Sequence, residues 1–127
     1  MDRNSPNGDT IYRMLPITSK INTWGDEIYF PLNVHLNLNS PVEVVTLGDI
    51  AYSKVYDAFC IFYGKTPISN NDEIVPNSPV DLIGRLEQDP SVLKELLSGL
   101  MRQKKRRILN RIGFLKKFAE TIRIEKR

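Results

Sequence analysis

The stretch at residues 48–69 constrains the fold of this chain more than any other. It contains the longest unbroken apolar run in the sequence, residues 58–63, and it turns sharply at Gly64 and Pro67. A strand that is apolar on both faces has to be covered on both faces. The run therefore predicts a strand that lies inside a sheet or a barrel.

Length and composition indicate one globular unit. The chain has 127 residues, of which 41% are hydrophobic and 26% charged, as is usual for a soluble domain with a single core. No segment reaches the roughly 18–20 apolar residues of a membrane span, and residues 1–10 lack the apolar core of a secretory signal. The single cysteine, Cys60, excludes an intramolecular disulfide and a cysteine-rich metal site. We therefore expect a reducing, cytoplasmic location.

The charge is distributed unevenly along the chain. Residues 1–101 hold 7 basic and 13 acidic residues, whereas residues 102–127 hold 11 basic and 2 acidic ones. This division predicts an acidic domain at 1–101 followed by a basic tail at 102–127. The tail is expected to meet an anionic partner or the acidic body itself.

Hydrophobic alternation predicts a mainly β fold. Strands are expected at residues 17–21, 27–30, 33–39, 42–47, 50–52, 58–63 and 80–86. A short helix is expected from Asp9 or Thr10 to Leu15, and a second one begins at Asp89-Pro90, a cap followed by proline. Residues 64–79 hold three prolines and predict a long irregular excursion. Short strands separated by turn signals indicate a barrel or a sandwich.

Three stretches carry a resemblance to a known family. They are LPITSKINTWGDEIYF (15–30), GDIAYSKVYDAFCIFYGKTPIS (48–69) and DEIVPNSPVDLIGRL (72–86). In this order they resemble the small prokaryotic cyclophilin-like β-barrel family, over roughly residues 8 to 101. The resemblance implies a cyclophilin-like closed β-barrel of eight strands with a short N-terminal helix, here followed by a basic helical extension.

The chain departs from the prolyl isomerases at the residues that matter for catalysis. AFCIFYGKT (58–66) resembles their central strand, but Cys60 stands where they place a phenylalanine of the proline pocket. No arginine lies between Phe30 and Gly48, although the isomerases use an arginine to polarise the prolyl amide. The resemblance therefore does not carry isomerase catalysis to this chain.

The resemblance also implies two further strands ahead of the helix, which this sequence does not show. Unpaired strand edges have to be covered, and residues 121–125 alternate as a strand does. We expect this segment to pair with the barrel, either in its own molecule or in a neighbouring one.

The residues of a ligand pocket are predicted from the aromatic placement and the resemblance. The candidates are Trp24, Tyr52, Cys60, Phe62 and Glu73. Aromatic walls with few polar groups suit a flat apolar or proline-like ligand, but core packing explains the same side chains. The carboxylate pairs Asp26-Glu27 and Asp72-Glu73 fit acid–base work, a divalent cation, or turns whose aspartate caps the backbone.

The basic tail offers a second candidate site. The residues expected to contact anions are Arg102, Lys104, Lys105, Arg106, Arg107 and Arg111. They stand beside apolar residues at helical spacing between Ile108 and Phe118. Such a helix can lie on an anionic membrane surface, follow nucleic-acid phosphates, or dock on a partner or on its own domain.

These observations lead to one functional prediction and two alternatives. We expect a non-catalytic barrel that binds a small ligand or an extended peptide beside residues 58–63. A weak peptidyl-prolyl isomerase and a nucleic-acid-associated protein acting through the tail are the alternatives, and the tail could also form a homo-oligomer. No catalytic residue, metal site or cofactor is predicted, because the only histidine is His35 and no glycine-rich phosphate loop occurs.

Overall fold

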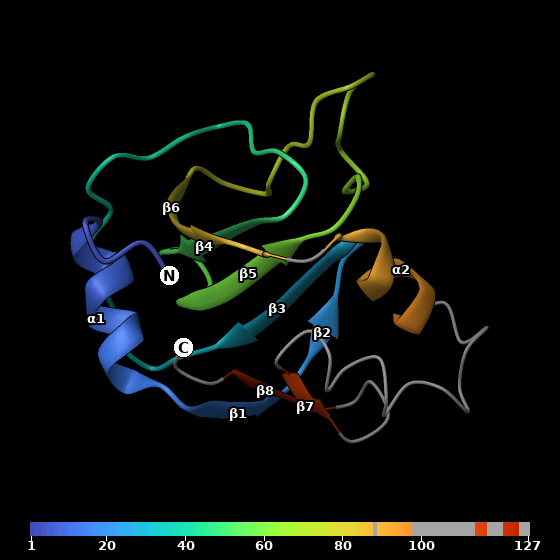
Figure 1. Ribbon diagram of the computed structural model, residues 1–127. Helices are drawn as coiled ribbons and strands as arrows, with labels where there is room; N and C mark the ends of the chain where they lie inside the picture. Colours follow the sequence, from blue (N-terminus) through green and yellow to red (C-terminus); the bar gives the residue numbers. More distant parts are fainter. Residues whose placement is uncertain (88, 98–113, 117–120, 125–127) are drawn as a thin grey trace.

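The computed structural model describes residues 1–87, 89–97, 114–116 and 121–124 (Figure 1). In chain order its elements are α1 (Pro6–Met14), β1 (Ile17–Lys20), β2 (Asn22–Thr23), β3 (Glu27–Pro31), β4 (Asp49–Ser53), β5 (Ala58–Phe62), β6 (Val80–Arg85), α2 (Ser91–Leu97), β7 (Phe114–Lys116) and β8 (Thr121–Ile124).

β5 is the middle strand of the larger sheet, whose order is β2-β3-β5-β4-β6. It pairs antiparallel with β3 on one side and with β4 on the other, so Cys60 lies opposite both Tyr29 and Ala51. All five residues of β5 are buried. The prediction of a strand covered on both faces is confirmed.

The described strands form two sheets rather than one closed ring. β1, β8 and β7 make the smaller sheet, and β2 and β6 are the two outer strands of the larger one. Figure 1 shows the smaller sheet lying below the larger one. The mainly β architecture is confirmed, but the predicted closed barrel is wrong for the part of the chain that the structure describes. One reason is that residues 33–39 and 42–47, both predicted as strands, are irregular.

Residues 33–39 alternate in sequence without forming a strand. Asn33 and His35 have φ angles of 60° and 52°, in the left-handed region that a strand cannot contain. The carboxylate of Asp57 stabilises this path because it accepts hydrogen bonds from the backbone N–H groups of Val34 and His35, at 3.1 and 2.8 Å. The apolar side chains still face inward, so the alternation reports burial and not sheet pairing.

Residues 42–47 contribute only two isolated bridges, Val42 to Val80 and Val45 to Ile74. The chain turns away from the sheet here because the Asp49 carboxylate accepts hydrogen bonds from the N–H and the hydroxyl of Thr46, at 2.8 and 3.1 Å. This segment therefore lies over the larger sheet instead of extending it.

Alternation along the strands gives the larger sheet two buried faces. The first face lies toward the smaller sheet and belongs to a cluster of Ile11, Ile28, Phe30, Ile50, Tyr52, Phe59, Ile61, Tyr63, Ile83 and Leu93. The second face belongs to a smaller cluster of Val45, Ala51, Ala58, Cys60, Phe62, Ile74 and Val80. The residues of β5 alternate between the two clusters, as a fully buried strand requires.

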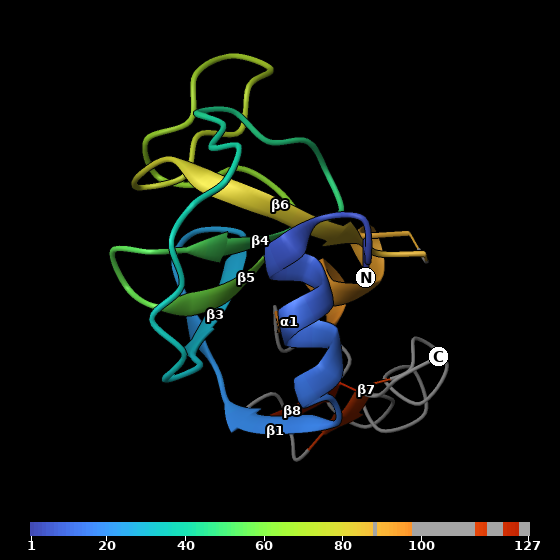
Figure 2. The ribbon, with the colours of Figure 1, turned by 90° about the vertical axis from the view of Figure 1, so that its left-hand side faces the viewer.

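Both helices cover the first face. α1 spans the molecule from β6 to β1 (Figure 2) and contributes Ile11 to the first cluster, while α2 contributes Leu93. α1 begins earlier than Asp9: Ser5 caps it by accepting a hydrogen bond from the Gly8 N–H at 3.2 Å, and Pro6 occupies the first turn. The predicted start of α2 is confirmed, because the Asp89 carboxylate accepts a hydrogen bond from the Ser91 N–H at 3.0 Å.

The end of the chain pairs within its own molecule. β8 runs antiparallel to β1, with Ile17 opposite Ile124 and Lys20 opposite Thr121, so the predicted added strand is confirmed. The predicted helical extension is wrong at Phe114–Lys116, which forms β7. The remainder of that helix, and the boundary predicted at 101/102, lie outside the described residues.

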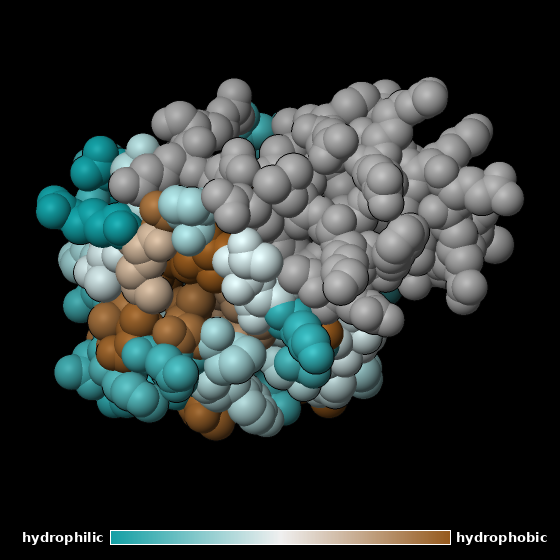
Figure 3. Space-filling model, turned by 90° about the horizontal axis from the view of Figure 1, so that it is seen from below, coloured by the Kyte–Doolittle hydropathy of each residue, from teal (hydrophilic) through white to brown (hydrophobic). Residues whose placement is uncertain are grey.

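Apolar side chains gather on part of the face of the molecule seen from below, beside the residues drawn in grey (Figure 3). Around the first cluster, partly buried hydrophobic residues such as Ile17, Leu36 and Ile124 pack against its buried members. Within the described ranges, no helix has the length and apolar character needed to cross a membrane.

Candidate functional site

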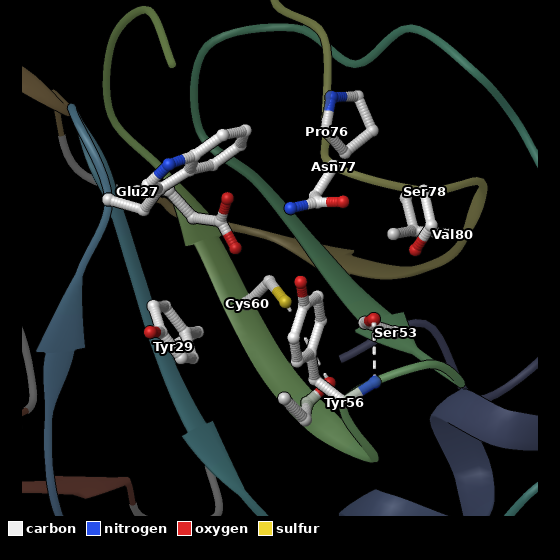
Figure 4. Close-up of a pocket in the computed structure, with 11 residues that line it drawn as sticks. Glu27, Tyr29, Ser53, Tyr56, Cys60, Pro76, Asn77, Ser78 and Val80 are labelled. Atoms are coloured by element: carbon white, nitrogen blue, oxygen red, sulfur yellow. Dashed lines mark hydrogen bonds between the residues drawn. The ribbon is translucent and has the colours of Figure 1, made fainter. Parts of the chain in front are cut away.

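A pocket of about 150 Å³ lies on the second face of the larger sheet (Figure 4). β3, β4 and β5 form its floor, and the segments around the β2–β3 turn, the β4–β5 connection and the end of the 64–79 excursion form its walls. The lining residues are Trp24, Glu27, Tyr29, Ser53, Tyr56, Ala58, Cys60, Pro76, Asn77, Ser78 and Val80.

The pocket exists because the second face carries small side chains at its centre. Ser53, Ala58 and Cys60 line the floor. The residues beside them on the same strands, such as Tyr52 and Phe59, point to the first face and are fully buried there. Small side chains under a covering loop leave space that large ones would fill.

A tight turn between β2 and β3 positions two of the lining residues. The N–H and carbonyl groups of Trp24 and Glu27 exchange hydrogen bonds of 2.9 and 3.2 Å across the two-residue loop Gly25-Asp26. Gly25 has a φ of +58°, and a Cβ there would lie 2.8 Å from the Lys65 carbonyl oxygen. Glycine at the first central position suits a two-residue hairpin turn. The turn holds Trp24 at the edge of the pocket and directs Glu27 into it.

The excursion at residues 64–79 is held in place by two hydroxyl groups. The Ser69 hydroxyl accepts hydrogen bonds from the Thr66 and Val75 N–H groups at 2.9 and 3.1 Å, and the Thr66 hydroxyl donates to the Val75 carbonyl at 2.5 Å. These bonds fix the path that brings Pro76, Asn77 and Ser78 over the sheet. The irregular excursion predicted from its prolines therefore supplies one wall of the pocket.

Glu27 is the charged group of the pocket. Its side chain is buried, with 7% of the residue exposed, and Figure 4 shows the carboxyl group directed toward Cys60 and Asn77. Burial raises the pKa of Glu27 to about 7, opposed by a hydrogen bond with the Cys60 thiol. The carboxyl group is therefore half ionised near neutral pH.

The Cys60 thiol is not prepared for nucleophilic attack. Burial raises its pKa well above the ordinary value, and the neighbouring Glu27 carboxylate raises it further. The sulfur also lies 3.8 Å from the Ala58 carbonyl oxygen. A thiol that stays protonated is a poor nucleophile, so Cys60 acts here as a small, weakly polar part of the floor.

Three aromatic side chains surround the carboxyl group. Trp24 and Tyr29 are half-buried and Tyr56 is exposed at 51%. The rings of Tyr29 and Tyr56 have centroids 6.3 Å apart and are tilted by 43°. The pocket therefore combines flat apolar walls with one acidic group, and no Lys, Arg or His occurs among the lining residues that the structure describes.

The structure brings only some of the predicted pocket residues together. Trp24 and Cys60 line the pocket. Tyr52 lies on the first face, where its hydroxyl accepts a hydrogen bond from the Leu36 N–H and donates one to Asp57, at 2.9 and 2.5 Å. Phe62 is buried in the second cluster and Glu73 is exposed in a turn closed by its hydrogen bond to Asn70.

The sequence singled out Glu27 only as a member of the Asp26-Glu27 pair and did not predict it as a pocket residue. The missed signal is its alternation: Glu27 and Tyr29 share the face of β3 opposite to Ile28 and Phe30. Since β3 pairs with a strand that is buried on both faces, an acidic residue on this face has to be buried as well. Tyr56, which also lines the pocket, was not among the predicted pocket residues.

The basic residues predicted to contact anions lie outside the described residues. These are Arg102, Lys104, Lys105, Arg106, Arg107 and Arg111, and their role stays a prediction from the sequence. Within the described ranges, no group of three or more His, Cys, Asp and Glu side chains is arranged to hold a metal ion.

Comparison with known proteins identifies two likenesses. A family model described as Cyclophilin-like matches residues 2–101. The solution structure of the hypothetical protein AF2241 from Archaeoglobus fulgidus is 48% identical over 63% of this chain, with a TM-score of 0.53. The match spans 62% of that protein, which is less than two thirds of its length. The comparison with curated proteins finds no match.

Proposed function

Because this chain belongs to the cyclophilin-like family, we propose that it is a non-catalytic binding protein that holds a small ligand in the pocket beside β5. The observation that carries the proposal is a cavity of about 150 Å³ with three aromatic walls and a buried carboxyl group. Ligand sites are typically concave and apolar with a few directed polar groups. This pocket has that composition.

The size of the cavity favours a small molecule over a long peptide. An engineered apolar cavity of about 150 Å³ in another protein accommodates benzene. The pocket here therefore suits a ligand of roughly six to ten non-hydrogen atoms, or one side chain of an extended peptide whose backbone lies outside. Polar groups at the rim, Ser53, Asn77 and Ser78, can orient the ligand by hydrogen bonds.

Three catalytic alternatives gain no support from the lining. Nucleophilic catalysis needs an activated thiol, whereas burial holds Cys60 in its protonated form. Acid–base catalysis by Glu27 would need a second group that titrates near neutrality and a partner arrangement, and the described lining offers neither. A prolyl isomerase acting through arginine has no guanidinium in this lining. A coupled proline-peptide assay should show no rate above buffer.

The proposal is tested by fragment binding followed by NMR. The ¹⁵N-labelled protein is titrated with a set of fragments of about ten or fewer non-hydrogen atoms. We expect at least one fragment to shift the amide signals of Glu27, Tyr29 and Cys60 while the signals of Phe59 and Ile61 move less. Absence of any fragment that shifts the lining residues would contradict the proposal.

A cavity-filling variant provides the matched test. Ala58 lines the floor and is 1% exposed, so Ala58→Leu places a larger side chain inside the cavity. We expect it to abolish fragment binding while the remaining amide spectrum stays folded. Val55→Ala changes a residue that is 69% exposed and does not line the pocket, and it should bind as the wild type does. Equal binding by Ala58→Leu would overturn the assignment of the site.

A further inference from the structure

Glu27 differs from the other buried carboxylates of the described chain. Asp49 is 4% and Asp81 is 3% exposed, and both have full sets of donors. Asp81 accepts hydrogen bonds from the Asn7 amide and from the N–H groups of Asn39 and Ser40, at 2.7, 2.7 and 3.0 Å. Buried carboxylates ordinarily require such compensation.

Asp49 is compensated in the same way. Its carboxylate accepts hydrogen bonds from Thr46 and forms an ion pair with Arg85, whose Nη1 lies 3.1 Å from Asp49 Oδ1. Glu27 has neither a cation nor a backbone donor: among the described residues, no Lys, Arg or His forms an ion pair with it. The Glu27 carboxyl group forms a hydrogen bond with the Cys60 thiol, and a thiol is a weak donor.

A polar atom on another wall of the same pocket has no hydrogen-bond partner among the described residues. The Ser78 hydroxyl oxygen is shielded from solvent and has no hydrogen-bond partner, alone among the buried side-chain oxygens and nitrogens of the described residues. Ser78 comes from the wall opposite β3. Two uncompensated polar groups that line one cavity indicate that its occupant supplies what both lack.

The lining also fixes the sign of the occupant's charge. Because the described residues that line the pocket include no Lys, Arg or His, they would hold an anionic ligand against the Glu27 carboxylate without compensation. A cation instead gains an ion pair in a site shielded from water, where charge interactions are stronger. It also gains favourable contact with the faces of Trp24, Tyr29 and Tyr56, because aromatic faces carry negative potential.

From these contacts we propose that the ligand is a small organic cation: a primary or substituted ammonium group on a compact apolar body. The ammonium group pairs with the Glu27 carboxylate and donates to the Ser78 hydroxyl, and the body lies against the aromatic walls. This inference rests on the proposed ligand-binding function and names the chemical class that the site takes.

The inference predicts how binding depends on pH. The other titratable groups among the described lining residues are the phenols of Tyr29 and Tyr56 and the thiol of Cys60, whose pKa is raised by burial. With a pKa of about 7, Glu27 is mostly protonated at pH 6 and mostly ionised at pH 8. Affinity for a cation should therefore rise about tenfold over this range.

The experiment compares three probes of similar shape that differ in charge. Benzylammonium, benzyl alcohol and benzoate are titrated into the ¹⁵N-labelled full-length chain at pH 8 and at pH 6. We expect benzylammonium to bind at least about tenfold more tightly than benzyl alcohol at pH 8, and benzoate not to bind. Benzylammonium should also lower the pKa of Glu27, and a pH titration of the ¹³C signal of its carboxyl carbon measures this change.

Two matched variants distinguish a direct contact between Glu27 and the ammonium group from a general effect of losing one negative charge. Glu27→Gln should reduce the preference for benzylammonium to within about twofold and remove its pH dependence. Asp26 lies in the same turn, pairs with Lys94 and does not line the pocket. The variant Asp26→Asn should therefore keep the preference for benzylammonium. An unchanged preference in Glu27→Gln, or equal loss in both variants, would overturn the inference.

The outcomes distinguish this inference from the function on which it rests. If benzyl alcohol shifts the lining residues as strongly as benzylammonium, the pocket binds ligands but the assignment of a cation is wrong. If the probes shift no lining residue although other fragments do, the cation assignment also fails and the binding function stands. If no fragment of any charge binds, both proposals fail.

Discussion

The two faces of the larger sheet are built from the same strands but differ in the size of their side chains and in the segments that cover them. On the first face the large side chains of Phe30, Tyr52 and Phe59 fill the space beneath two helices and the smaller sheet. On the second face Ala58 and Cys60 are small, and an irregular segment covers them. The comparison teaches that alternation along one strand can place large packed side chains on one side and a cavity on the other.

The carboxylates that anchor covering segments differ from the carboxylate in the pocket. Asp57 and Asp81 serve the first face by holding residues 33–40 in a path that covers it, each through several hydrogen bonds. Glu27 serves the second face and lacks comparable partners in the described chain. Compensated carboxylates stabilise a fold, whereas an uncompensated one lowers stability and is tolerated where a ligand uses it.

The largest effect tests the packing of the first face. Phe59 is fully buried and its ring stacks on Phe30 with centroids 5.0 Å apart. We expect Phe59→Ala to lower the free energy of unfolding by about 3–5 kcal/mol, through lost burial and the cavity left behind. Urea unfolding followed by circular dichroism measures the change.

The neighbouring position on the same strand is the control. Cys60→Ala removes a side-chain atom from the second face, next to space that already exists, and should cost about 1 kcal/mol. If the two substitutions cost the same, the two faces do not differ in packing and the comparison fails.

The second effect tests the anchoring of the loop that covers the first face. Asp81→Ala leaves the Asn7 amide and the N–H groups of Asn39 and Ser40 without their common acceptor. We expect a loss of about 2–4 kcal/mol in the free energy of unfolding, together with faster amide exchange at Asn39 and Ser40.

Asp9→Ala provides the contrast. Asp9 is partly exposed and pairs with Arg3 and Arg13 at 2.9 Å. Exposed ion pairs contribute little to stability because water and salt screen them, so this variant should stay close to the wild type. Unchanged amide exchange at Asn39 in Asp81→Ala would show that the loop does not depend on this carboxylate.

The hydrogen bonds of Asp57 and Asp81 to residues 34–40 explain why the fold could be predicted only in part. The 58–63 run identified the middle strand because burial on both faces is recorded in consecutive residues. The alternation of Val34, Leu36 and Leu38 reports which side chains face the core, and it is the same for a strand and for an irregular segment that follows the surface of a sheet. Sequence could not separate the two, because the decision rests on Asp57 and Asp81, whose hydrogen bonds join residues more than twenty positions apart.

The pocket was predictable to a similar extent. Cys60 and Trp24 were found because one lies in the central strand and the other beside a turn. Tyr52 belongs to β4 and Phe62 to β5. The register of β4 against β5 directs Tyr52 to the opposite face, and Phe62 is buried within the second cluster. Glu27 could be recognised only once β3 was known to pair with a fully buried strand.

The third prediction is a gain in the free energy of unfolding instead of a loss, and it tests the buried charge on the second face. The pKa of Glu27 is raised from 4.5 to about 7 in the folded protein. A raised carboxyl pKa means that the folded state binds the proton more tightly than the unfolded chain does, so stability is full below pH 4.5 and is lost as the pH rises to 7. Glu27→Gln should therefore be more stable than the wild type at pH 8, by roughly 2–3 kcal/mol.

The pH profile distinguishes this cause from improved packing. The advantage of Glu27→Gln should disappear at pH 4, where the wild-type carboxyl group is neutral in both states. Urea unfolding at a series of pH values measures it. A constant advantage at every pH would mean that charge burial is not the reason, and a loss of stability at pH 8 would show that the carboxylate is compensated after all.

The smallest effect on stability tests whether the second face is organised for binding. Tyr56 lines the mouth of the pocket and is 51% exposed, and no described element depends on its ring. Tyr56→Ala should change the free energy of unfolding by less than about 1 kcal/mol while weakening benzylammonium about fivefold or more, because one of three aromatic walls is lost. Ile68→Ala, at a residue 48% exposed outside the pocket lining, should change neither quantity. A residue whose truncation weakens binding but not folding belongs to a binding site. If both variants bind benzylammonium equally well, Tyr56 is an ordinary surface residue.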